Sequence, residues 1–411
     1  MPIYKNSKTK YFPSGEEYFS ALIDELQKAK RFIFIEYYII NEGKMWDSVY
    51  SILRVKAQAG LDIRIIYDDL GCINTLPQNF KKELEKNGIK CEAFNPIYPI
   101  VTLAHNNRDH RKVVVIDGIV AFTGGINLSD EYINVVKRFG HWKDTGIMVE
   151  GTAVESFILM FLETWHIYRD QNEDFSKFLP DIKTLPITTE YVKTRFRKKK
   201  IKIIGRDEQK ITEEVKDNDA VLDIVKSRNE FVQPYMSTPM ETDEIVARNV
   251  YVNILACADY YVYITTPYLI LDPELEEALI NCAKRSVDVR IIVPGIPDKK
   301  TVYAVTRSQY SSLLKAGVKI YEYEPGFIHA KNVVSDDKVA TVGSINFDNR
   351  SFYHNYENGV FIYNSPSIRY IKEDFIKTMN ASIAVATDYV SHLSLIKRIK
   401  ISMLKLLSPL L

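Results

Sequence analysis

Two histidines in this chain stand in the same local pattern of residues. His110 and Lys112 begin "HRKVVVID", and His329 and Lys331 begin "HAKNVVSD". With 7 histidines, 54 basic and 53 acidic residues in 411, a His-x-basic-x4-acidic pattern is expected about 0.12 times by chance. Two occurrences therefore indicate a repeated functional element.

An asparagine extends the register of both copies. Asn127 lies 17 residues after His110, and Asn346 lies 17 residues after His329. Two lysines and two amide donors suit an anionic centre that gains negative charge in its transition state, such as a phosphodiester. One neutral histidine can attack phosphorus while the other, protonated, donates to the leaving oxygen. The pattern thus predicts transfer through a covalent phosphohistidine.

The acidic residue of each pattern stands apart from the other two. If the segment is a strand, His110 and Lys112 point to one face and Asp117 points to the other. The second copy, which ends in Asp336, obeys the same parity. Both aspartates belong to the candidate catalytic pattern, but they stand where a tight hairpin turn is expected, and geometry favours a structural role there.

Carboxylates that orient the histidines must then come from elsewhere. Asp144 in "KDTGIMVEG" and Glu357 in "YENGVFIYN" each stand two residues before a glycine that opens an apolar strand. A carboxylate bonded to one imidazole nitrogen fixes the tautomer of the ring. An ordinary strand-entry turn would explain a single copy, but the matched pair favours the orienting role.

These matched residues belong to a longer internal repeat. Apolar stretches suited to strands recur in the same order at 31–40 and 260–270, at 62–66 and 288–292, and at 88–96 and 317–325. Each half reads strand–helix–strand–helix–strand followed by a hairpin. The repeat predicts an α/β fold of two similar domains, each a mixed sheet flanked by helices, that arose by duplication. A basic connection at 193–210 places the boundary near residue 210, giving domains 1–210 and 211–411.

Composition limits the other functional classes. The net charge of +1 gives no overall attraction to nucleic acid or anionic lipid, so a basic surface must be local. The sequence contains no run of 18 apolar residues, so it predicts no membrane-spanning helix. No His/Cys cluster or H-E-x-x-H pattern predicts a metal site, and no G-x-S-x-G predicts a serine nucleophile. We therefore expect no cofactor.

The sequence resembles the phospholipase D superfamily, whose HxKxxxxD motif matches both quoted patterns. It is more narrowly similar to bacterial cardiolipin synthases in "FIEYYII", "WKDTGIMVEG", "FIHAKNVVSDDKVATVGSINFDNRSF" and "LLSPLL", and the similarity covers essentially the whole chain. The resemblance implies that two phosphatidylglycerol molecules give cardiolipin and glycerol without metal or nucleotide. It also implies that Asp144 and Glu357 each hold the histidine of the opposite half. We expect His110 to attack and His329 to act as the acid.

The resemblance also raises expectations about the membrane. Such synthases commonly begin with two transmembrane helices, which this sequence lacks, so we expect peripheral attachment to the cytoplasmic face, or a tether in an absent N-terminal segment. An insertion at 98–107 and a basic amphipathic helix at 395–411 could contact lipid or pack on the protein. Asp109 replaces the asparagine expected before the first motif, which should only adjust local polarity.

Two alternatives remain open. A phospholipase D or nuclease would use the same first half-reaction and then accept water. A catalytically dead lipid- or nucleic-acid-binding module is disfavoured, because both halves keep their histidine, lysine and asparagine. The expected partners are anionic phospholipid and the membrane surface, without nucleic acid.

Overall fold

The computed structural model describes residues 1–5, 7–96, 106–169, 173–179, 230–239 and 244–386. Several predicted features lie outside the described residues: the boundary near 210, the basic connection 193–210, residues 98–105 of the insertion, and the helix 395–411.

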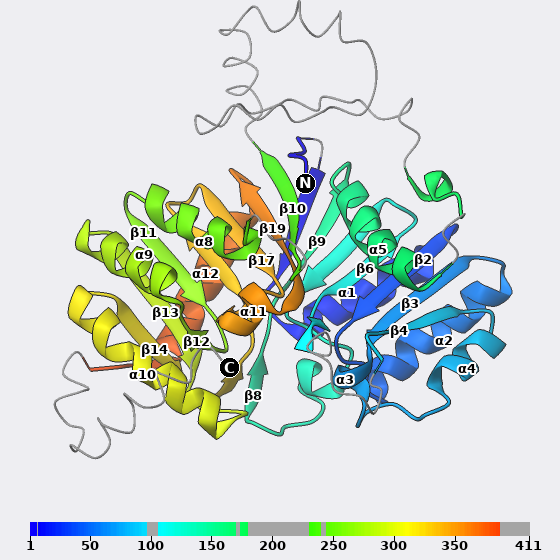
Figure 1. The fold of residues 1–411 in the computed structure, drawn as a ribbon, viewed down its shortest axis with the longest axis horizontal. Coiled ribbons are helices and arrows are strands. Elements are labelled where there is room, and N and C mark those ends of the chain that lie inside the picture. The colour runs from blue at the N-terminus through cyan, green and yellow to red at the C-terminus, as the bar shows by residue number, and fades with distance from the viewer. Residues whose placement is uncertain (6, 97–105, 170–172, 180–229, 240–243, 387–411) are drawn as a thin grey trace, which may run out of the picture.

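The first half of the chain forms a mixed sheet in the order β1-β9-β7-β6-β2-β3-β4 (Figure 1). Its strands are β1 (Ser7–Phe12), β2 (Phe32–Tyr37), β3 (Asp62–Asp68), β4 (Lys90–Phe94), β6 (Lys112–Ile116), β7 (Val120–Gly124) and β9 (Gly146–Gly151). β2, β3 and β4 are parallel, and β6, β7, β9 and β1 pair antiparallel with their neighbours.

The second half repeats this order in a sheet that runs β10-β19-β17-β16-β11-β13-β14-β20. Its strands are β10 (Phe231–Ser237), β11 (Tyr261–Thr265), β13 (Asp288–Pro294), β14 (Lys319–Tyr323), β16 (Asn332–Ser335), β17 (Val339–Gly343), β19 (Asn355–Tyr363) and β20 (Ser382–Ala384). Three parallel strands are again followed by an antiparallel hairpin.

Helices cover the sheets. They are α1 (Gly15–Lys28), α2 (Lys44–Gln58), α3 (Asp69–Cys72), α4 (Phe80–Lys86), η2 (Asp130–Ile133), α5 (Val154–Tyr168), η3 (Ser176–Phe178), α8 (Val246–Cys257), α9 (Pro273–Lys284), α10 (Lys300–Ala316), α11 (Asn349–Tyr353) and α12 (Ser367–Asn380). Local sequence sets their starts, since Asp272 caps the first turn of α9 and Pro273 occupies its first position. The predicted α/β architecture of mixed sheets flanked by helices is confirmed.

The central strands are mostly apolar because both of their faces are covered. Ile33 and Ile35 of β2 belong to a core that includes residues of α1 and α2. On the other face, Phe34 stacks on Phe161 of α5 with ring centroids 4.5 Å apart. This second core continues into the other half, where it includes Val342 and Val360. The two halves therefore share one hydrophobic core.

Short strands join the halves as well. β5 (Arg108–Asp109) pairs in parallel with the start of β19, and β8 (His141–Lys143) pairs in parallel with β15 (Gly326–Ile328). Within the second half, β12 (Leu269–Ile270) pairs with β18 (Phe347–Asp348), and an isolated bridge between Ile40 and Leu128 stands at the corresponding place in the first half. The two pairings that join the halves bring the predicted motif of each half to the seam between the sheets.

Candidate active site

Both motif histidines are fixed by the opposite half of the chain. His110 follows β5, and its backbone N–H donates to the carbonyl of Tyr356 at 2.9 Å. His329 follows β15, and its backbone N–H donates to the carbonyl of Lys143 at 2.7 Å. Both histidines are largely buried, 9% and 7% exposed. The seam thus sets the position of each ring through main-chain bonds.

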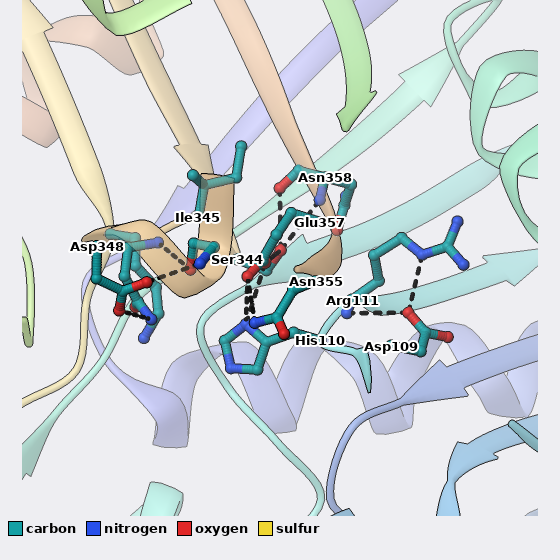
Figure 2. A network of polar contacts seen from close by, with 12 residues as sticks. Asp109, His110, Arg111, Ser344, Ile345, Asp348, Asn355, Glu357 and Asn358 are labelled. Carbon is teal, nitrogen blue, oxygen red and sulfur yellow. Dashed lines mark hydrogen bonds and ion pairs between the residues drawn. The ribbon is translucent and has the colours of Figure 1, made fainter. Parts of the chain in front are cut away.

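A carboxylate of the opposite half engages each imidazole through Nδ1. Both oxygens of Glu357 lie 3.0 Å from Nδ1 of His110, as Figure 2 shows. Oδ2 of Asp144 lies 2.7 Å from Nδ1 of His329. A carboxylate at Nδ1 favours the tautomer that carries its proton there, which leaves Nε2 with a free lone pair. Each ring therefore has one nitrogen available for chemistry.

Burial keeps the two imidazoles neutral. Burial, with a contribution from Lys112, lowers the pKa of His110 to about 4, although Glu357 opposes the shift. Burial and Lys331 lower the pKa of His329 to about 3 against the opposing effect of Asp144. A bound phosphodiester anion would favour the protonated form of a nearby imidazole. The site can therefore acquire its acid when an anionic substrate binds.

The orienting carboxylates stay ionised despite their burial. Burial alone would raise the pKa of Asp144, but His329 and Lys331 hold that pKa below its usual range. The same balance, with His110 and Lys112 as partners, lowers the pKa of Glu357. At neutral pH, each carboxylate can therefore accept a hydrogen bond from the Nδ1–H group of its histidine.

The two lysines belong to one buried cluster of charge. The ammonium groups of Lys112 and Lys331 donate to the carbonyls of His110 and His329. Burial lowers the pKa of Lys112 to about 8 and that of Lys331 to about 7. The proximity of Lys112 contributes to the shift of Lys331, so the two cations repel each other. A phosphodiester anion between them would relieve this repulsion.

The two asparagines are also buried at the site. Nδ2 of Asn127 donates to the hydroxyl of Tyr132 at 2.6 Å, and its Oδ1 accepts from the backbone of Ile39. Nδ2 of Asn346 donates to Asp348 at 3.0 Å. An amide nitrogen carries two protons, so one of these contacts leaves a second donor for a ligand. The predicted phosphate contacts are compatible with this arrangement.

Asp117 and Asp336 lie at the opposite ends of their strands from the histidines. Both residues adopt positive φ in hairpin turns. The carboxylate of Asp117 accepts from the backbone N–H groups at 30, 31 and 32, at 2.7–3.0 Å. Asp336 accepts from those at 259, 260 and 261, at 2.7–2.9 Å. This geometry favours the turn role for both aspartates over a direct part in the chemistry.

The reactive rings are surrounded by aromatic side chains. The ring centroid of Tyr38 lies 5.0 Å from that of His110. Trp142, Tyr132 and Phe327 lie 5.4, 5.5 and 5.9 Å from His329. Apolar walls strengthen electrostatic interactions in the site and limit the approach of water.

A second buried cluster of charge lies behind the first motif. The guanidinium of Arg111 contacts Asp109 at 2.9 Å, Glu36 at 2.7 Å and Thr164 at 2.6 Å. Figure 2 shows Asp109 and Arg111 set apart from the His110–Glu357 pair. Burial, against the effect of Arg111, raises the pKa of Glu36 well above its usual value. Asp109 thus does more than adjust local polarity, because it shares one cation with a second buried carboxyl group.

Comparison with known proteins identifies the family. The family model described as "Cardiolipin synthase, PLD-like domain" matches residues 22–146 and 251–379. The chain belongs to this family. A "Cardiolipin synthase 2" from Bacillus anthracis is 33% identical over 98% of this chain and 71% of that protein. An "Uncharacterized protein" from Streptococcus mutans is 43% identical over the whole chain and 80% of that protein.

A solved structure shows the same fold. The crystal structure of phosphatidylserine synthase from Haemophilus influenzae Rd KW20 matches with a TM-score of 0.68, at 15% identity over 100% of this chain and 97% of that one. The match to the PLD-like domain model confirms the predicted membership of the phospholipase D superfamily. No helix within the described ranges is long and apolar enough to span a membrane. Within the same ranges, no group of three or more His, Cys, Asp and Glu side chains could hold a metal ion.

Sequence reasoning missed two residues in this family member's site. The hydroxyl of Ser344 donates to Glu357, and Nδ2 of Asn355 donates to the same carboxylate at 3.2 Å. Gly125 occupies the position of the first repeat that corresponds to Ser344 in the second. A Cβ on Gly125 would lie 2.2 Å from Oδ1 of Asp144. The signal was the one-letter difference between "GGIN" and "GSIN". The two orienting carboxylates are therefore supported differently.

Proposed function

We propose that this family member is a phosphatidyltransferase that makes cardiolipin and glycerol from two phosphatidylglycerol molecules. The observation that carries the proposal is the pair of histidines, each bonded through Nδ1 to a carboxylate of the opposite half. Two buried lysines in the same cluster match an anionic phosphodiester. Phospholipid chemistry is also supported by the names of the family model and the relatives.

The proposed first step forms a covalent intermediate. Nε2 of His110 attacks phosphorus, and the bond between phosphorus and the oxygen of the glycerol headgroup breaks. His329, protonated once the anion is bound, gives its proton to that oxygen, so glycerol leaves as the neutral alcohol. Lys112, Lys331 and the two asparagine amides stabilise the charge that develops on the phosphoryl oxygens.

The proposed second step reverses the first with a different alcohol. A hydroxyl of a second phosphatidylglycerol attacks phosphorus while His329 takes its proton, and the bond to Nε2 of His110 breaks. One phosphodiester is exchanged for another, so the sequence of steps consumes no nucleotide. We propose that the protein works as a peripheral protein at the cytoplasmic face of the membrane, on anionic phospholipid and without nucleic acid.

Lipid analysis tests the proposal directly. The protein is incubated with phosphatidylglycerol vesicles, and the products are separated and quantified. Cardiolipin with an equal amount of glycerol is the expected result. Phosphatidic acid as the main product would instead identify a phospholipase D that uses water. If the phosphatidylglycerol stays unchanged, the proposal that the protein is an enzyme acting on this lipid is overturned.

A further inference from the structure

The active site lies at one end of the two sheets. The pairing of Tyr37 with Lys112 places His110 beside the carboxyl end of β2. The pairing of Thr265 with Asn332 likewise places the second motif beside the carboxyl end of β11. Because β3 and β13 run parallel to these strands, the loops that follow them leave the sheets at the same end. The segment after η2 also lies there, since it leads into β8.

Exposed apolar side chains gather on these loops. Five large apolar residues there are between 40% and 54% exposed: Leu70, Ile73, Val135, Val136 and Ile296. Leu70 and Ile296 occupy the same position of the repeat, eight residues after the first residue of β3 and of β13. Figure 1 shows α3, β8 and α10 along the lower edge of the molecule. We call the segments 70–73, 134–140 and 295–300 the loop face, although the first segment includes most of the short helix α3.

The loop face is continuous with the walls of the site. Ile296 adjoins the middle loop, since a Cβ on Gly140 would lie 3.4 Å from its Cδ1. In the same loop, the ring of Phe139 lies 6.4 Å from Trp142, which in turn contacts His329. On the other side, the loop after β3 packs against Tyr38, which contacts His110. Tyr38 and Trp142 thus each link one histidine to a segment of the loop face.

Basic side chains accompany the apolar ones. Lys137, Arg138, Lys299 and Lys300 are all exposed on these loops. Three carboxylates on or beside the loops offset part of this charge: Glu131 lies 3.9 Å from Arg138, Asp298 accepts from the hydroxyl of Tyr268, and Asp69 precedes Leu70. Exposed aliphatic side chains with surplus positive charge match an anionic bilayer surface, which attracts lysine and arginine and accepts apolar side chains at its interface.

We propose that the loop face docks on an anionic lipid bilayer and thereby aims the active site at lipid headgroups. The reason for this orientation rests on the proposed function, because a phosphodiester headgroup can then reach the histidines while its acyl chains stay in the bilayer. The docking itself requires no turnover. It involves described residues that are distinct from the insertion and the terminal helix predicted from the sequence.

Sedimentation with vesicles tests the docking. The full chain with V135D and V136D is compared with the full chain carrying V55D and I119D, which adds the same charge at exposed apolar positions away from the loop face. The loop-face variant should bind phosphatidylglycerol-containing vesicles about tenfold more weakly, while the control variant binds like the wild type. Phosphatidylcholine vesicles should bind all three proteins weakly. Equal binding of the loop-face variant and the wild type would overturn the proposal.

A turnover measurement separates this proposal from the proposed function. Short-chain phosphatidylglycerol below its micellar concentration should be converted equally by the wild type and by V135D/V136D, because neither valine touches the histidines. Turnover of vesicle lipid should fall with binding. If no protein converts either substrate, the proposed function fails, and vesicle binding still decides the docking.

Insertion depth provides an independent readout. A V136W variant should lose fluorescence on vesicles that contain brominated lipid, whereas I119W should not. The three native tryptophans are buried and give the same background in both variants. No difference in quenching between the two variants would place the loop face away from the bilayer.

Discussion

At the scale of single residues, the site is a set of buried groups whose pKa values are all lower than usual. The two histidines are held neutral and the two lysines are held close to losing their charge, while the paired carboxylates stay ionised. The carboxylates offset part of the repulsion between the two ammonium groups, which still lowers the pKa of Lys331. A phosphodiester anion bound between the lysines would stabilise their charged forms further.

Removal of either histidine should abolish turnover. H110A lacks the proposed nucleophile and H329A lacks the proposed acid, so each variant should lose at least about a thousandfold in kcat for cardiolipin formation. With phosphatidylglycerol labelled in its phosphate, H329A should retain more protein-bound label than H110A after denaturation in alkaline detergent, because a phosphohistidine bond is stable in alkali and labile in acid. Substantial residual turnover in H110A would rule out a single essential nucleophile at that position.

The pH profile should reflect the unusual pKa values. The value of kcat/KM reports the free enzyme, in which raising the pH through about 7 to 8 discharges Lys331 and then Lys112. Anion binding should therefore weaken on the alkaline side, and kcat/KM should fall above pH 8. On the acid side, activity should persist below pH 6, because the histidines stay neutral there. A flat profile between pH 7 and 9.5 would contradict the assigned role of the lysines.

At the scale of elements, the sequence predicted what repeats within each half. Strand parity placed His110 and Lys112 on one face, and the matched spacing identified both carboxylates. The pairing of each carboxylate with the opposite histidine came only from the family resemblance. This pairing depends on the short strands β5, β8 and β15, through which the two halves meet. These strands are only two or three residues long, too short for an alternation of apolar and polar residues to predict them.

The role of Asp109 could not be predicted from the sequence pattern. Glu36, which contacts the same guanidinium, stands inside a strand that is otherwise largely apolar. The sequence pattern carried no information on which buried side chain would meet Arg111. The contacts of Arg111 in the folded chain show that two carboxyl groups share this guanidinium.

This cluster should make stability depend on pH. The pKa of Glu36 is raised in the folded protein, so folding takes up a proton above the unfolded pKa, and stability falls as pH rises from there. Relative to E36Q, the wild type should lose on the order of 1 kcal/mol of unfolding free energy per pH unit in that window. D109N should show a weaker dependence, because it removes a neighbour that raises the pKa. Urea unfolding between pH 5 and 8 measures all three proteins, and parallel curves would refute the idea.

At the scale of the whole molecule, duplication has produced two halves that are similar but not independent. One hydrophobic core contains Phe34 and Val149 from the first half together with Val342 and Val360 from the second. The parallel pairs β5·β19 and β8·β15 cross the same seam. The shared core leads us to expect that the two predicted domains unfold as one cooperative unit.

Unfolding should therefore occur in a single step. Far-ultraviolet circular dichroism and tryptophan fluorescence should give coincident urea transitions. The three tryptophans lie in the first half, so a core truncation in the second half is informative. V360A, which removes buried methyl groups from the shared core, should lower the midpoint seen by tryptophan fluorescence, with a loss of about 1–3 kcal/mol. A fluorescence transition that stays unchanged in V360A would show that the halves unfold separately.

The exchange of carboxylates across the seam has a consequence for synthesis. When a ribosome has made the first half, His110 exists, but Glu357 is still 247 residues away. A free imidazole without its carboxylate has no fixed tautomer, and the second lysine has not yet been made. On the proposed mechanism, the growing chain therefore becomes reactive only when both halves have been completed and joined.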